Sequence, residues 1–299
     1  MASVLVIGAG TMGRGIAGAC ALAGHETAVF DADPESQRAV RGHIESSWGR
    51  AIDKGKLTSG AAEQARHRLR AVERLKDGSN VDIAIEAVPE ALDLKRMIFS
   101  ELDDLCPSRT LLATNTSSLS ITKIAHATGR RDRVIGIHFF NPVAAMPLVE
   151  IVRGKETSRE TESRALEFAR SLGKEAVLVF DSPGFATSRL GVALGLEAMR
   201  MVEDGIAGPE DIDRALELGY GHRMGPLKTS DLVGLDVRLA IAETLAAELP
   251  SERFTPPEIL RTLVAEGHTG RKSGQGFYRW DADKATGPGT RAAELARKR

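Results

Sequence analysis

The stretch SVLVIGAGTMGRGIAGACALAG, residues 3–24, constrains the fold most, because it joins a run of strand formers directly to a glycine-rich helix start. Gly8, Gly10 and Gly13 form the pattern G-x-G-x-x-G, and the next β-rich run ends in Asp31. Glycines at such a junction permit a tight turn, and the helix N-terminus offers N–H groups to a phosphate. The stretch therefore predicts a βαβ unit that binds a dinucleotide.

The acidic residue after the second strand indicates which dinucleotide is bound. Asp31 can accept hydrogen bonds from ribose hydroxyls and would repel a 2′-phosphate, so NAD is favoured over NADP. Asp33 competes for this role, but it precedes Pro34, and Asp-Pro is typical of a helix N-cap and first turn. The alternative is a glycine-rich helix start that only packs closely. The motif residues expected to contact NAD are Gly8, Gly10, Thr11, Met12, Gly13 and Asp31.

Short β-rich runs alternate with longer helical segments over the first 180 residues. Most of the runs lack polar alternation, which is typical of parallel strands covered by helices on both faces. Strands are expected at 3–9, 26–32, 81–88, 110–115, 133–140, 147–152 and 175–180. Helices are expected at 11–24, 34–54, 59–71, 91–105, 118–127 and 158–172. The pattern predicts an α/β fold with a mostly parallel sheet.

The composition changes after DSPGF, residues 181–185, and only helical periodicity follows to about residue 265. We therefore expect an α/β NAD-binding domain over 1–182 and an all-α domain over 183–282. Residues 283–299 form a polar tail that is expected to be disordered.

The charge balance argues against several classes of partner. The 299 residues include 40 Lys and Arg and 41 Asp and Glu, so neither nucleic acid nor an anionic membrane attracts the chain as a whole. No apolar run approaches the roughly 20 residues of a membrane-spanning helix, and the early first strand leaves no space for a signal peptide. Cys20 and Cys106 are interpreted as small apolar residues in a reducing compartment. A soluble cytoplasmic protein without a metal site is expected.

A histidine and a glutamate interrupt two apolar runs in GIHFFNPVAAMPLVE, residues 136–150. A single histidine in a strand is often structural, but a buried Glu150 is costly unless it is paired, and His138 is an available partner. A carboxylate keeps an imidazole in one tautomer and makes it a better proton acceptor. Beside a nicotinamide, such a pair can remove a hydroxyl proton while hydride leaves the carbon.

Polar residues follow the neighbouring strands at the same sheet edge, where ligands of parallel sheets bind. Ser117 or Asn115 is expected to hold a substrate oxygen, and Asn115 also to reach the cofactor. One of Ser117 and Ser118 is expected to cap the next helix. Either Glu86 or Glu90 is expected near the nicotinamide half. The polar residues after these strands are Glu86, Glu90, Asn115, Thr116, Ser117, Ser118 and Asn141.

Several motifs together resemble the 3-hydroxyacyl-CoA dehydrogenase family, in its 3-hydroxybutyryl-CoA dehydrogenase branch, over about residues 3–280. They are GAGTMG, EAVPE, ATNTSSLSIT, HFFNPVAAMPLVEIV, DSPGF, LGYGHRMGPL, DLVGLD and GRKSGQGFY. The resemblance implies a Rossmann-type domain followed by an all-α domain that mediates homodimerisation. It also implies reversible oxidation of a short-chain L-3-hydroxyacyl-CoA to the 3-oxoacyl-CoA with NAD.

The resemblance also implies roles for individual residues. It makes His138 the base, Glu150 its orienting carboxylate and Ser117 a contact of the substrate oxygen. Asn141 would lie near the nicotinamide, and Glu90, Lys95 and Lys272 would bind NAD. Lys54 resembles a lysine that contacts CoA, and its neighbours Arg50 and Lys56 could meet CoA phosphates. A solvated helix end is the alternative for this basic group.

The chain departs from the family at one position. It has PGFATSR, with Ser188 where the family usually has an asparagine that helps to position substrate. Serine is shorter and lacks the amide, so acyl-chain preference or rate is expected to differ. Two rival functions remain open. One is a dehydrogenase of a free hydroxy acid or sugar acid, and the other is a non-catalytic NAD(H)-binding relative.

Overall fold

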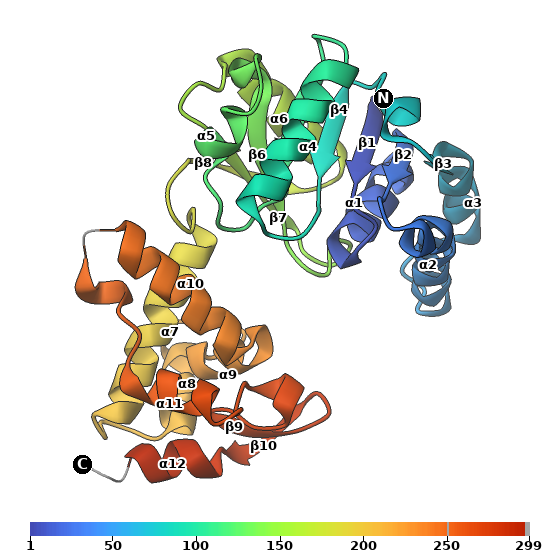
Figure 1. Ribbon diagram of the computed structural model, residues 1–299. Coiled ribbons are helices and arrows are strands. Elements are labelled where there is room, and N and C mark those ends of the chain that lie inside the picture. The colour runs from blue at the N-terminus through green and yellow to red at the C-terminus, as the bar shows by residue number, and fades with distance from the viewer. Residues whose placement is uncertain (250, 297–299) are drawn as a thin grey trace. The chain divides into compact units, whose positions relative to one another are not determined.

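The computed structural model describes residues 1–249 and 251–296 and divides the chain into two compact units, Met1–Ser182 and Pro183–Arg299. The first unit is an α/β structure, and the second is mainly helical (Figure 1). Among the described residues no helix is long and apolar enough to cross a membrane.

The first unit is built on one eight-stranded sheet with the order β3-β2-β1-β4-β5-β6-β7-β8. All neighbouring strands are parallel except β6 and β7, which are antiparallel, so the prediction of a mostly parallel sheet is confirmed. The strands are β1 (Ser3–Ile7), β2 (Glu26–Phe30), β3 (Leu69–Ala71), β4 (Ile83–Glu86), β5 (Leu111–Thr114), β6 (Val134–Phe139), β7 (Leu148–Arg153) and β8 (Glu175–Phe180).

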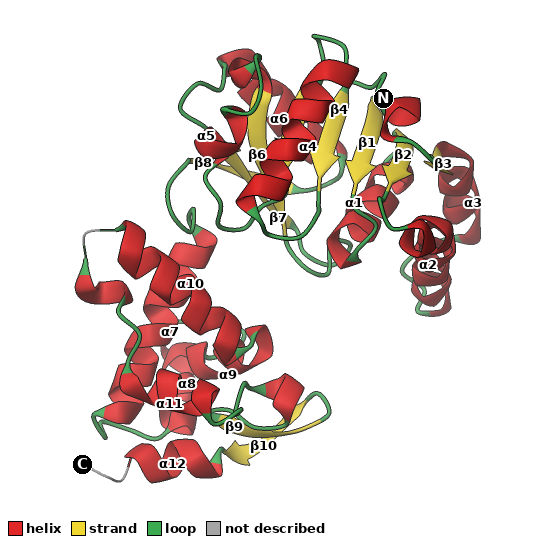
Figure 2. Cartoon of the chain, viewed as in Figure 1, coloured by secondary structure: helices red, strands yellow, loops and turns green. Residues whose placement is uncertain are grey.

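Helices cover the sheet, and Figure 2 shows them as red coils around the yellow strands. Val4 and Val6 of β1 pack in one buried cluster with Ile16 and Phe168, which come from the first and sixth helices of the chain. The helices are α1 (Thr11–Leu22), α2 (Pro34–Asp53), α3 (Ser59–Arg68), α4 (Leu92–Leu105), α5 (Ile121–Ala125) and α6 (Arg159–Ser171). Burial on both sides explains why most of the strands lack polar alternation.

Two predicted helices differ from those observed. The helix expected over 59–71 ends at Arg68, because the next three residues form β3 and pair with Thr27–Val29 of β2. The helix expected over 118–127 is α5 alone. Cys20 and Cys106 are buried and free, and burial raises the pKa of Cys20 to about 12 and that of Cys106 to about 11.

The second unit packs its helices around a separate buried cluster. Its elements are α7 (Thr187–Glu203), α8 (Pro209–Gly219), α9 (Pro226–Val233), α10 (Leu235–Glu248), α11 (Glu258–Ala265), β9 (Tyr278–Asp281), β10 (Lys284–Pro288) and α12 (Thr290–Ala296). The antiparallel pair β9 and β10 is an addition to the expected all-α domain.

The expectation of a disordered tail over 283–299 is wrong for the described part of that segment. Residues 284–288 form β10, and Ala292 of α12 is buried in the cluster of the helical unit. Apolar burial and strand pairing therefore order a sequence that is polar on average. Residues 297–299 lie outside the described residues.

The motif GRKSGQGFY, residues 270–278, is held against α9 by one buried carboxylate, Asp231. A Cβ on Gly270 would lie 2.3 Å from the Asp231 carbonyl oxygen, and one on Gly276 would lie 2.2 Å from Asp231 Oδ1, so only glycine permits this approach. Burial raises the pKa of Asp231 to about 6, which leaves it ionised at neutral pH. Its carboxylate accepts hydrogen bonds from the backbone N–H groups of Phe277 (3.0 Å) and Tyr278 (2.9 Å) and from the indole N–H of Trp280 (2.9 Å).

We expect Asp231→Ala to destabilise the helical unit, because it leaves buried N–H donors without an acceptor. Each such donor costs about 1–3 kcal/mol, so the free energy of unfolding should fall by about 3 kcal/mol or more. Urea unfolding followed by tryptophan fluorescence would measure the change. Asp283→Ala is the matched control, because Asp283 is 85% exposed and pairs only at the surface with Arg271. Equal effects of the two substitutions would contradict the role given to Asp231.

Candidate active site

The turn between β1 and α1 has the geometry of a phosphate cradle. Gly8 has a φ of 104°, and a Cβ there would lie 2.6 Å from the Ala87 carbonyl oxygen. A Cβ on Gly13 would lie 1.8 Å from the Gly8 carbonyl oxygen. Gly10 is the N-cap of α1 without a side-chain cap, and no heavy atom lies within 4 Å of its Cβ position. Open space therefore meets the first N–H groups of a helix, an arrangement that fits a pyrophosphate.

Asp31 follows β2 directly and lies beside this turn. Its Oδ2 accepts a hydrogen bond from the Ala9 amide at 2.5 Å, and its Oδ1 accepts one from the Asp33 amide at 2.8 Å. Asp33 in turn accepts from the Ser36 amide at 2.9 Å and caps α2, as its place before Pro34 predicts. Asp31 therefore lies beside the glycine turn, whereas Asp33 caps α2.

His138 and Glu150 face each other across the antiparallel strands β6 and β7. His138 Nδ1 lies 2.7 Å from Glu150 Oε2, and the two residues are 6% and 0% exposed. The pair predicted from the two interrupted apolar runs is therefore present. A carboxylate on Nδ1 selects the tautomer that has its acceptor lone pair on Nε2. The arrangement suits a proton acceptor.

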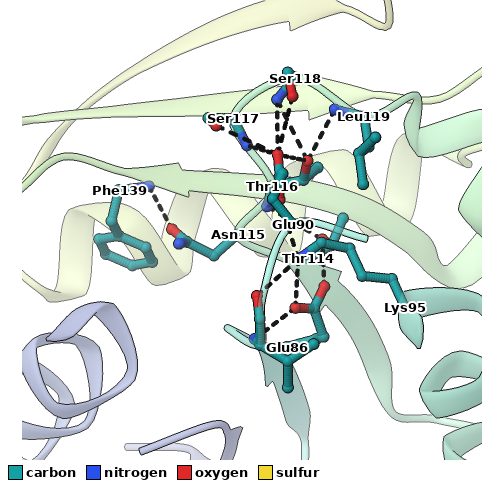
Figure 3. A network of polar contacts seen from close by, with 11 residues as sticks. Glu86, Glu90, Lys95, Thr114, Asn115, Thr116, Ser117, Ser118, Leu119 and Phe139 are labelled. Carbon is teal, nitrogen blue, oxygen red and sulfur yellow. Dashed lines mark hydrogen bonds and ion pairs between the residues drawn. The ribbon is translucent and has the colours of Figure 1, made fainter. Parts of the chain in front are cut away.

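Two neighbours fix the backbone and the ring around His138. Asn115 Oδ1 accepts a hydrogen bond from the Phe139 amide at 2.9 Å, which ties the end of β5 to β6 (Figure 3). The ring of Phe140 lies 4.5 Å from the imidazole, centroid to centroid. Asn141 is exposed directly after these residues. Asn115 therefore uses its carbonyl oxygen on the backbone and keeps its amide group as a donor.

The loop after β5 folds around the carboxylate of Glu90 (Figure 3). Glu90 Oε1 accepts from Thr116 Oγ1 (2.6 Å), from the amides of Ser117 (2.9 Å) and Ser118 (3.2 Å), and from the hydroxyls of Ser118 (3.1 Å) and Ser117 (3.3 Å). Burial alone would raise the pKa of Glu90, but the Thr116 hydrogen bond, the charge of Lys95 and the Ser117 amide outweigh it and lower the pKa. Glu90 is thus an ionised anchor for Ser117.

A second carboxylate, Glu86, forms a fully buried ion pair with Lys95. The Lys95 Nζ–Glu86 Oε1 distance is 2.6 Å, and the side chains are 1% and 0% exposed. Glu86 Oε2 accepts from Thr114 Oγ1 at 2.7 Å, while Lys95 also lies 3.3 Å from Glu90 Oε2. Of the two glutamates expected near the nicotinamide, only Glu90 is partly exposed. Lys95 links both carboxylates and does not project into solvent.

Sequence reasoning did not find this ion pair, although a signal exists. Lys95 lies on the same stripe of α4 as the buried Ile98, Phe99 and Leu102. A charged residue on the apolar stripe of a helix needs a buried partner. Sequence reasoning was also wrong about the cap of the following helix, because Ser120 caps α5 and neither Ser117 nor Ser118 does.

The structure brings His138, Glu150, Asn115, Ser117 and Glu90 to consecutive strands of one sheet. Other candidate residues lie elsewhere. Lys54 ends α2 and is exposed, as are Arg50 and Lys56.

Two further candidates belong to the helical unit. Ser188 lies in the first turn of α7, and Lys272 pairs with Asp236 at 2.6 Å. Over the described part of the chain, no group of three or more His, Cys, Asp or Glu could hold a metal ion.

Comparison with known proteins supports one family. The model described as 3-hydroxyacyl-CoA dehydrogenase, NAD binding domain, matches residues 3–182, and that of the C-terminal domain matches residues 184–280. The probable 3-hydroxybutyryl-CoA dehydrogenase of Bacillus subtilis is 42% identical over 93% of this chain and 97% of the relative. A Mycobacterium tuberculosis 3-hydroxybutyryl-CoA dehydrogenase is 44% identical over 91% of this chain and 96% of its own.

A solved structure agrees with these matches. The (S)-3-hydroxybutyryl-CoA dehydrogenase of Ralstonia eutropha aligns with a TM-score of 0.90 at 40% identity, over 93% of this chain and 99% of that one. The glycine turn and Asp31 fit the NAD that the matched domain binds. The chain belongs to the 3-hydroxyacyl-CoA dehydrogenase family.

Proposed function

We propose that this protein catalyses the reversible oxidation of a short-chain L-3-hydroxyacyl-CoA to the 3-oxoacyl-CoA with NAD. The observation that carries the proposal is the buried His138–Glu150 pair, 2.7 Å between Nδ1 and Oε2, in the sheet that also holds the glycine turn. The names of the relatives, which refer to 3-hydroxybutyryl-CoA, support a short chain.

His138 and Glu150 act as one unit in this proposal. When bound, NAD would supply the hydride acceptor for the carbon that carries the hydroxyl group. His138 takes the hydroxyl proton at Nε2, and Glu150 holds the Nδ1–H tautomer and stabilises the imidazolium that forms. In the opposite direction His138 donates that proton. Ser117 and Asn141 position the substrate oxygen, and Glu90 orients Ser117 through its backbone amide.

The remaining candidate residues are proposed to bind the cofactor and the substrate. Glu90, Asn115 and Lys272 are proposed for NAD, and Ser188 for substrate. Lys95, which the sequence suggested for NAD, is buried against Glu86, so its proposed role is to hold Glu90 in place. The exposed cations Arg50, Lys54 and Lys56 are proposed for the CoA phosphates, which their charge complements.

A homodimer through the helical unit and a cytoplasmic location are also proposed. Exposed apolar side chains of that unit support the homodimer, because such side chains gather at subunit interfaces. They are Leu190, Leu194, Ile206, Leu218, Tyr220, Met224, Val233 and Val237.

We expect purified protein to oxidise NADH rapidly in the presence of acetoacetyl-CoA. NADPH in place of NADH should be a much poorer reductant, because Asp31 repels a 2′-phosphate. Absorbance at the NADH band measures both rates. Free acetoacetate separates the rivals: turnover without the CoA moiety would favour a dehydrogenase of free hydroxy acids. NADH binding without any turnover would favour a non-catalytic relative.

Glu150→Gln should lower kcat about 10²-fold or more and leave NADH affinity nearly unchanged, because it removes the charge that stabilises the imidazolium. Steady-state kinetics and a fluorescence titration of NADH measure the two quantities. Glu162→Gln is the matched control, a buried glutamate of the same unit that pairs with Arg153. If turnover survives in Glu150→Gln, the His–Glu pair is structural and the proposed mechanism is wrong.

The two directions of the reaction should have displaced pH optima. Oxidation needs a neutral imidazole to accept a proton, and reduction needs the imidazolium to donate one. Because reduction consumes the proton that oxidation releases, the optimum for reduction should lie below that for oxidation. Measurement of kcat/KM against pH in both directions tests this. Coincident optima would count against His138 as the proton carrier.

A further inference from the structure

The helical unit has an arginine, Arg238, on the buried face of α10, where an apolar residue is expected. The buried side of α10 consists of Leu235, Arg238, Ala242 and Leu245, at helical spacing. Arg238 is 8% exposed, so nine-tenths of this cationic residue is removed from water. Arginine is almost never buried to this extent without a partner. We therefore expect an anionic group beside Arg238.

No such anion is found within residues 1–249 and 251–296. In that part of the chain no group accepts a hydrogen bond from the Arg238 guanidinium or forms an ion pair with it, and its Nε is buried without a partner. The carboxylate nearest in sequence, Asp236, is paired with Lys272. Burial lowers the pKa of Arg238, but an arginine stays protonated in proteins. The positive charge is therefore present, and it has no ion-pair partner among the described residues.

The guanidinium lies against the face of α7 that also carries Ser188. A Cβ on Gly191 would be 3.3 Å from Arg238 Nη1 and 3.8 Å from Nη2. The guanidinium therefore packs directly against the backbone of α7 at this glycine. Gly191 follows Ser188 by three residues, and residues at this spacing are neighbours on a helix surface, about 5–6 Å apart. Gly195, one turn further along, faces Ser230 in the same way. Arg238 thus lies about one helical turn from Ser188.

We propose that Arg238 binds a carboxylate at the far end of the acyl chain, so that the preferred substrate is a CoA thioester with an acidic chain terminus. The proposal rests on the proposed function, in which Ser188 contacts substrate. A guanidinium matches a carboxylate with two parallel hydrogen bonds. A chain that ends in a methyl group would leave the guanidinium, and its buried Nε in particular, without an acceptor, and sites with unpaired polar groups discriminate strongly.

The first test uses two chains of equal length, 3-oxohexanoyl-CoA and 3-oxoadipyl-CoA, which differ in a terminal methyl or carboxylate. We expect wild-type protein to have at least a tenfold higher kcat/KM for the carboxylate, about 1.4 kcal/mol of discrimination. Acetoacetyl-CoA is assayed in parallel, with NADH absorbance as the readout. This comparison needs no variant, so misfolding cannot obscure it.

The second test replaces the charge. Arg238→Met should lower kcat/KM for 3-oxoadipyl-CoA at least about 30-fold more than for 3-oxohexanoyl-CoA, mainly through KM, because discrimination by unpaired polar groups is large. Arg238→Lys should fall between, since lysine keeps the charge but loses the planar fork. Arg214→Met is the matched control, because Arg214 is exposed on α8, and it should leave the ratio of the two substrates unchanged.

The outcomes separate this proposal from the one on which it rests. Turnover of none of the three thioesters would overturn both. Turnover of acetoacetyl-CoA with equal kcat/KM for the two six-carbon chains would overturn only the role of Arg238. If Arg238→Met lowers both six-carbon activities equally and dissociates an oligomer in light scattering, the missing anion belongs to another copy of the chain, and the substrate proposal is wrong.

Discussion

The reversal of strand direction between β6 and β7 is the constraint on which the site depends. Antiparallel strands can be joined by a short connection, whereas parallel strands need a long crossover. Residues 140–147 are therefore enough to return the chain and place Glu150 directly opposite His138. The reversal also brings the start of β7 to the edge where the parallel strands end. A fully parallel sheet would separate the histidine and the glutamate by an entire crossover segment.

Buried charge at this edge is tolerated because every charge has an opposite or a donor nearby. Glu86 and Glu90 share one cation, Lys95, and hydroxyl and amide donors complete their hydrogen bonds. Removing one member of such a set leaves the others uncompensated, which costs more than the set contributes when it is intact. Arg238 differs from these residues, because its buried Nε has no hydrogen-bond partner among the described residues.

Local signals predicted much of the architecture and part of the site. The glycine turn and the cap at Asp33 follow from neighbouring residues, and the His138–Glu150 pair follows from two interruptions of apolar runs. Features that depend on distant partners were missed. β3 forms only because β2 offers an edge, and the hairpin of β9 and β10 lies in a segment too polar to suggest a strand. For the Glu86–Lys95 pair, the only signal in the sequence was a charged residue, Lys95, on the apolar stripe of α4.

One oxygen atom, Glu90 Oε1, receives five hydrogen bonds, which exceeds what two lone pairs can satisfy at once. The donors therefore compete, and the weakest by distance is the Ser117 hydroxyl at 3.3 Å. That hydroxyl can turn toward another acceptor at little energetic cost, while the Ser117 amide at 2.9 Å keeps the residue in place. The loop thus combines a backbone held in a fixed position with a hydroxyl group that can rotate and redirect its hydrogen bond.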